Sequence, residues 1–237
     1  MDRLIRPDRG LTIAEAKKIV DDVYNGRRLI DTQDRFHNTF FYEICPLLLI
    51  AEHVGNNETR IGFMGAKSRF DGLLLLGKKG KKQKVELTAA IDGQNDALQM
   101  ELLKKRGHAP AFQKIKSTGT RRNREFGKNT TNMIRSDEYN QKTLIPLLKD
   151  ALARKIKKAK RNQDYADAWL GIGFDDGICP LSGREKKKRF DPLCRQVLGN
   201  VPERYAPFSR VFFVGISRKY FFDSGRHLRR PRQGNAT

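Results

Sequence analysis

The sequence predicts a mixed α/β fold, in which a mixed central β-sheet is flanked by helices on both faces. Helical periodicity in the first fifty residues gives way to extended segments separated by turns, and a long helix followed by a strand comes later. The 237 residues suffice for one domain with a substantial core. We expect a single domain over residues 1–225, with its core in 34–175, and a basic, disordered tail over 226–237.

Two helices begin the predicted order. Thr12 and Glu15 have the spacing of a capping box, and apolar residues then recur at helical intervals, which predicts a helix over 12–24. A second apolar stripe predicts a helix over 34–54, which Pro46 would kink and Gly55 would end.

Three extended segments follow, over 60–64, 69–77 and 83–91. The last two flank residues 78–82, in which four lysines surround one glycine. This arrangement predicts a β-hairpin with a lysine tip.

The second half alternates helices, loops and strands. We expect a helix over 93–106, a long basic loop over 107–137, and a helix over 139–162 whose second half is a lysine stripe. A strand over 169–174, a loop-rich stretch over 178–207 with a short helix near 191–198, and strands over 210–216 and 220–223 complete the order.

The charge is unevenly distributed. The net charge is +21, yet residues 1–77 hold equal numbers of acidic and basic side chains, so residues 78–237 carry the entire excess. Because a polyanion relieves self-repulsion and releases counterions, this distribution indicates a nucleic-acid partner. The residues expected to contact its phosphates are Lys78, Lys79, Lys81, Lys82, Arg121, Arg122, Arg124, Lys157 and Lys158.

Other partners and locations are less well supported. An anionic membrane surface is disfavoured because no broad apolar helical face backs the basic segments. No apolar run approaches the roughly 20 residues of a membrane span, and no apolar signal region follows the first residues. The three cysteines form no CxxC pair. We therefore expect a cytoplasmic protein with reduced thiols and no membrane partner.

Two acidic residues interrupt the apolar arms of the predicted hairpin. Asp71 precedes four leucines, and Glu86 lies between Val85 and Leu87. The two can meet at the same end of the hairpin, and buried carboxylates need a cation, so they are candidate ligands of a divalent metal. Alternatively, both acids face solvent and pair with nearby lysines.

These residues resemble the PD-(D/E)xK nuclease superfamily, which includes many restriction and repair endonucleases. The resemblance covers roughly residues 34–106 and rests on a helix with an internal Glu, Phe70-Asp71-Gly72, the hairpin, Val85-Glu86-Leu87-Thr88 and a following helix with glutamines. It implies a restriction-endonuclease-like α/β/α core in which the two acids bind Mg²⁺, with Mn²⁺ as a substitute.

The remaining catalytic positions depart from that pattern in one respect. The family's lysine, two residues after the second acid, corresponds here to Thr88, which carries no charge. Lys84 is the first candidate for a replacement cation, because it shares a strand face with the second acid, and Lys67 is the next. The resemblance further implies a helical acid, for which we prefer Glu43, and a helical glutamine, Gln99.

Three functions remain open from the sequence. The first is a Mg²⁺-dependent endonuclease of restriction or defence type that hydrolyses phosphodiester bonds in double-stranded DNA, for which a homodimer would suit cutting of both strands. The second is a non-catalytic nucleic-acid-binding protein with the same fold, favoured by Thr88. The third, a protein that binds structured RNA, requires only the charge.

Overall fold

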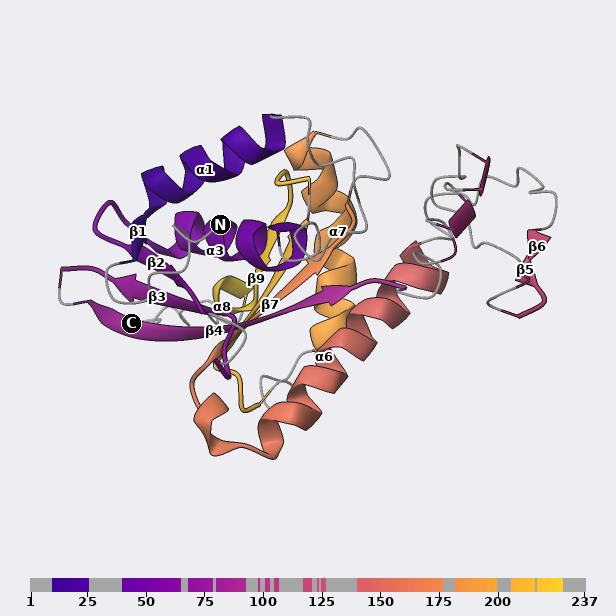
Figure 1. The fold of residues 1–237 in the computed structure, drawn as a ribbon. Coiled ribbons are helices and arrows are strands. Elements are labelled where there is room, and N and C mark those ends of the chain that lie inside the picture. The colour runs from indigo at the N-terminus through magenta and orange to yellow at the C-terminus, as the bar shows by residue number, and fades with distance from the viewer. Residues whose placement is uncertain are drawn as a thin grey trace, which may run out of the picture.

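A computed structural model describes residues 10–25, 40–64, 68–78, 80–92, 98, 101–102, 105–106, 117–120, 123, 125–126, 140–176, 182–199, 206–215 and 217–227. A seven-stranded mixed sheet lies at its centre, in the order β1-β2-β3-β4-β7-β8-β9 (Figure 1). Its strands are β1 (Leu11–Thr12), β2 (Arg60–Phe63), β3 (Gly72–Leu76), β4 (Lys81–Ala90), β7 (Trp169–Phe174), β8 (Arg210–Gly215) and β9 (Phe221–Asp223). The predicted mixed α/β class is confirmed.

The sheet combines an antiparallel half with a parallel centre. Strands β1 to β4 pair antiparallel in sequence order, whereas β4, β7 and β8 run parallel, and β9 returns antiparallel to β8. Parallel neighbours require crossover connections, and helices lie between β4 and β7 and between β7 and β8 in the chain.

Helices cover both faces of this sheet. The helices α1 (Ile13–Asn25) and α3 (Cys45–Val54) pack on one face through a core that includes Val85 and Leu87 of β4. The helices α6 (Ile145–Lys160) and α7 (Gly183–Leu198) pack on the other, in a core that includes Ala90 of β4. Because side chains alternate along a strand, Glu86 and Thr88 point to the face that α6 covers.

Two expectations for the first helices are borne out, and one is not. The capping box of α1 is present, since Glu15 N–H donates to Thr12 Oγ1 at 3.2 Å and Thr12 N–H to the Glu15 carboxylate at 2.8 Å. Gly55 ends α3. Pro46 does not kink a continuous α-helix: it lies in the first turn of α3, where a missing N–H costs nothing, after the π-helical segment η2 (Phe40–Ile44). Residues 34–39 lie outside the described residues.

The hairpin turn is tighter than predicted. It runs from Gly77 to Gly80, both with positive φ, and Gly80 N–H donates to the Gly77 carbonyl at 2.9 Å. Two glycines that adopt left-handed conformations allow this short connection. Lys81 and Lys82, which we expected in the turn, instead begin β4.

The short helix predicted near 191–198 was wrong in length, because α7 begins at Gly183. A second capping box, formed by Ser182 and Glu185, starts it. In the first turns of α7, an inward position that would normally hold an apolar residue is occupied by Lys186, which is 2% exposed. Helical periodicity of apolar residues alone could not reveal this half of the helix.

The remaining elements follow the prediction only in part, because short helices form over Gln163–Tyr165 and Ser224–His227, and the second includes the start of the tail expected to be disordered. The segment η3 (Asn140–Leu144) precedes α6, and η4 (Gln163–Tyr165) and α8 (Ser224–His227) are short. The few described residues of 93–106 between 98 and 106 are helical, and β5 (Ser117–Thr118) pairs with β6 (Glu125–Phe126) inside the stretch predicted as a basic loop. Within the described residues, no helix has the length and apolar character needed to cross a membrane.

Candidate active site: two carboxylates beneath the lysines of α6

The register of the hairpin brings Asp71 and Glu86 together. Gly72 lies opposite Val85, so Asp71, one residue before β3, continues the pairing beside Glu86. The Leu87 N–H donates to Asp71 Oδ2 at 2.7 Å and fixes the carboxylate there. Met64 N–H donates to the Asp71 carbonyl at 3.1 Å, which holds the backbone at the same place.

Glu86 is a buried carboxylate held by two lysines. It is 1% exposed, and its Oε1 accepts from Lys155 Nζ at 2.5 Å and from Lys158 Nζ at 2.9 Å. Both lysines belong to α6 and are three residues apart, so they lie on the same side of the helix. The other oxygen, Glu86 Oε2, is buried and accepts no hydrogen bond from any described residue.

The carboxyl group of Asp71 has a raised pKa. Burial raises this pKa above its usual range, and the negative charge of Glu86 raises it further, against the opposing Leu87 N–H and the two lysines. Lys158 shows the opposite balance. Burial lowers its pKa, but its contacts with Tyr165 and Glu86 outweigh that effect and raise it, so this side chain is an ammonium ion.

The donor chemistry of this pair fits a magnesium ion. Mg²⁺ is typically held by one or two carboxylates, with water and substrate oxygens completing its shell. Asp71 and Glu86 supply that number, and the buried, unsatisfied Glu86 Oε2 needs a positive partner. No group of three or more His, Cys, Asp or Glu that could hold a metal occurs among the described residues, so Glu43 does not join the two acids.

The other predicted catalytic residues lie as follows. Thr88 is half-buried and follows the second acid on the same strand face. Lys84 is exposed, and its Nζ donates to the Asp164 carbonyl at 3.3 Å. Glu43 is half-buried on η2, which adjoins α3. Gln99 and Lys67 lie outside the described residues.

Lys155 is the site residue that sequence reasoning missed. The sequence predicts Lys84 or Lys67 as the replacement cation, and Lys158 as a phosphate contact. The available signal was the lysine stripe of the long helix, but Glu86 is 69 residues from Lys155 in the chain. The apolar stripe of α6 identifies its inward side, and Lys155 continues that stripe between Leu152 and Ala159. The stripe does not identify the strand residue that Lys155 contacts.

A basic hollow lies along β4 on the side of the lysine tip. β4 begins at Lys81, but its pairing with β7 begins only at Val85, which lies opposite Trp169. The first four residues of β4 therefore have a free edge with room beside it. The resulting hollow has a volume of about 480 Å³. Its lining residues are Leu73, Lys81, Lys82, Gln83, Lys84, Ala166, Asp167, Ala168, Trp169 and Ser209. Three exposed lysines therefore follow the strand that carries Glu86.

The remaining predicted phosphate contacts are only partly described. Lys157 is exposed on α6, and Lys78 is exposed at the hairpin turn, where its Nζ lies 3.7 Å from Glu58 Oε1. Lys79, Arg121, Arg122 and Arg124 lie outside the described residues.

A second buried ion pair has a structural role. Lys186 Nζ donates to Asp176 Oδ2 at 2.8 Å, to the Asp176 carbonyl at 2.6 Å and to Ser217 Oγ at 2.9 Å. Ser217 N–H donates to Asp176 Oδ1 at 2.8 Å, so both carboxylate oxygens are occupied. Asp176 therefore ties α7 to the end of β8 and is not available as a metal ligand.

Comparison of the chain with protein-family models, curated proteins and solved structures found no match. The functional assignment therefore depends on the residues of this chain.

Proposed function

We propose that this protein is a Mg²⁺-dependent endonuclease that hydrolyses phosphodiester bonds in double-stranded DNA. The observation that carries the proposal is the convergence of Asp71 with Glu86, whose buried Oε2 lacks a partner among the described residues. Support also comes from the order of helix, three antiparallel strands, helix and parallel strand, with helices on both faces, which agrees with the core implied by the PD-(D/E)xK resemblance.

The proposed chemistry assigns separate tasks to the residues of the site. Asp71 and Glu86 hold the metal, which when bound lowers the pKa of a water and offsets the charge that develops on the phosphate. Lys155 supplies the positive charge that Thr88 lacks, and its bond to Glu86 Oε1 keeps the ammonium beside the reacting group. The Thr88 hydroxyl can accept or donate a hydrogen bond and so orients a water.

The lysines of the basic hollow hold the substrate in register. Lys81, Lys82 and Lys84 bind the phosphate backbone, which positions the duplex without reading its sequence. Because Lys84 and Glu86 share a strand face, a backbone bound along these lysines leads to the two carboxylates.

The test is cleavage of supercoiled plasmid DNA with Mg²⁺ or Mn²⁺. We expect the unmodified protein to nick or linearise the plasmid, and Asp71→Asn and Glu86→Gln to abolish cleavage while both still bind DNA. Asp22→Asn, an exposed carboxylate of α1, is the matched control and should cut normally. Metal-dependent cleavage that persists in both site variants would contradict the assigned site.

A non-catalytic nucleic-acid-binding protein is the second candidate. The observation in its favour is that Lys155 and Lys158 already neutralise Glu86, while Thr88 offers no catalytic cation. This alternative predicts salt-dependent DNA binding with no cleavage under either metal, and no stabilisation of the fold by Mg²⁺.

A further inference from the structure

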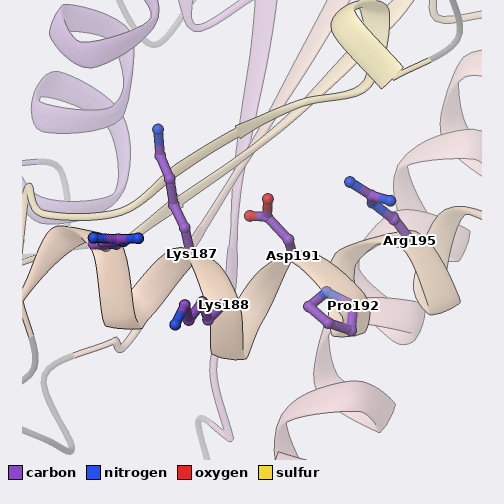
Figure 2. A pocket seen from close by; sticks show the side chains of 6 residues that line it. Lys187, Lys188, Asp191, Pro192 and Arg195 are labelled. Atoms are coloured by element: carbon purple, nitrogen blue, oxygen red, sulfur yellow. The ribbon is translucent and has the colours of Figure 1, made fainter.

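The outer face of α7 carries a basic hollow that is separate from the two carboxylates. The hollow has a volume of about 420 Å³ and is lined by Arg184, Lys187, Lys188, Asp191, Pro192 and Arg195. Lys187, Asp191 and Arg195 project from the same side of the helix, while Lys188 and Pro192 lie on the adjoining side (Figure 2). The lining therefore holds four cations and one carboxylate.

The helix separates its charges by face. The inward stripe consists of apolar residues and Lys186, whose ammonium is neutralised by Asp176. The basic residues of the hollow are all exposed. Within the described part of the chain, neither Lys187 nor Lys188 forms an ion pair. The ammonium groups of Lys187 and Lys188 are consequently exposed to solvent.

The single acid of the hollow is held by the protein itself. Asp191 Oδ1 accepts a hydrogen bond from the Tyr220 hydroxyl at 3.1 Å, and that hydroxyl also lies 3.2 Å from Cys194 Sγ. Glu185, the other acid of the helix, is engaged by Ser182 in the capping box and does not line the hollow. With four cations and one carboxylate, the lining of the hollow still carries an excess of positive charge.

We propose that this face of α7 binds a phosphodiester backbone, as a second nucleic-acid contact besides the hollow along β4. From Arg184 to Arg195 the cations extend over about 16 Å of helix, the length of roughly five base pairs. A repeating polyanion matches such a row better than a small anion does. The inference rests on the proposed nucleic-acid partner and does not require cleavage.

The test compares two adjacent lysine pairs on opposite sides of the sheet. Lys187→Gln/Lys188→Gln removes two charges from the proposed face, and Lys17→Gln/Lys18→Gln removes two exposed charges from α1. Binding of the full-length chain to a 30-base-pair duplex is measured by fluorescence anisotropy in EDTA over a range of salt concentrations. Equal melting temperatures of the two variants establish that both are folded.

We expect the α7 variant to bind more weakly and to reduce the slope of log K against log salt by about 1.8, since each phosphate contact contributes about 0.9. The α1 variant should keep the slope of the unmodified protein. In a second measurement, bound duplex should protect Lys187 and Lys188 from acetylation, read by mass spectrometry.

An unchanged slope in the α7 variant would overturn the proposal. The proposal would also be overturned if the α7 variant lost binding to phosphatidylserine vesicles but still bound DNA normally. That result would identify a membrane surface as the partner of this face of α7. Because all measurements are made in EDTA, failure of the proposed nuclease chemistry leaves this result unaffected. Conversely, if cleavage requires Asp71, the proposed nuclease function remains supported even when the α7 face binds no DNA.

Discussion

Asp71→Asn is expected to stabilise the metal-free protein while it abolishes activity. The substitution keeps the shape of the side chain and an oxygen that can accept from the Leu87 N–H. It removes the repulsion between the carboxylates of Asp71 and Glu86, and it also removes the cost of partly burying an ionised carboxylate. Both effects favour the folded state at neutral pH.

The expected gain depends on pH in a defined direction. Because the pKa of Asp71 is raised by folding, the native state binds a proton more tightly than the unfolded chain does. Stability therefore falls as pH rises from the unfolded pKa through the folded pKa, and the full penalty is present above the folded value. The advantage of Asp71→Asn should be absent in acid and complete at neutral pH.

The stability gained by Asp71→Asn can be compared with the stability that metal binding would add. A site substitution of this kind typically gains about 0.5–2 kcal/mol, and with a shift of about 2–4 °C per kcal/mol for a chain of this size the melting temperature rises by roughly 1–8 °C. Mg²⁺ at 100 times its Kd would stabilise the unmodified protein by about 2.7 kcal/mol. The Asp71→Asn variant should not be stabilised by Mg²⁺.

The assay is thermal unfolding followed by circular dichroism between pH 4 and 8, in EDTA and in MgCl₂. Glu86→Gln provides the contrast, since it leaves the Lys155 ammonium without its charged partner and should lower the melting temperature in EDTA. Asp22→Asn should leave the melting temperature unchanged both in EDTA and in MgCl₂. If Asp71→Asn were destabilising at pH 8 in EDTA, or equally stabilised by Mg²⁺, the account of the acidic pair would be refuted.

Three further substitutions test other parts of the structure. Asp176→Asn leaves the buried Lys186 ammonium without a counter-charge and should cost about 3–5 kcal/mol in urea unfolding; a loss below 1 kcal/mol would contradict the buried pair. Gly72→Ala places a Cβ 2.4 Å from a buried leucine side chain of α3 and should cost about 1–3 kcal/mol in the same assay. Lys155→Met should reduce single-turnover cleavage by about 10²-fold or more with DNA affinity retained, whereas Lys157→Met, at an exposed position of the same helix, should weaken binding only; equal effects would contradict the catalytic role.

The helices and strands that the sequence predicted well are those whose apolar residues recur with a clear helical or strand period. The helix after Thr12 and the strand 169–174 formed close to their expected limits, and the helix expected over 139–162 formed as π-helical η3 followed by α6. The errors arose where another interaction replaced the apolar signal. Lys186 lies inside α7 because Asp176 neutralises it, so the first half of α7 looks like a charged loop in sequence.

The candidate site was predictable as far as local chain geometry could determine it. Asp71 and Glu86 lie in one hairpin, and their proximity follows once its register is known. Lys155 comes from a distant segment, and its place at Glu86 depends on how α6 packs on the sheet. Such a contact is tertiary, and neither motif spacing nor strand alternation contains it.

The lysines at Glu86 do not exclude the proposed metal, because they occupy only one of the two carboxylate oxygens. Both bind Oε1, which orients the carboxylate and leaves Oε2 buried with no partner among the described residues. With both acids ionised, the two carboxylates and two ammonium groups sum to zero charge, so a divalent cation would leave the site positive. A phosphodiester backbone would offset that excess. The charge balance therefore favours metal and nucleic acid binding together, and by linkage each would raise the affinity for the other.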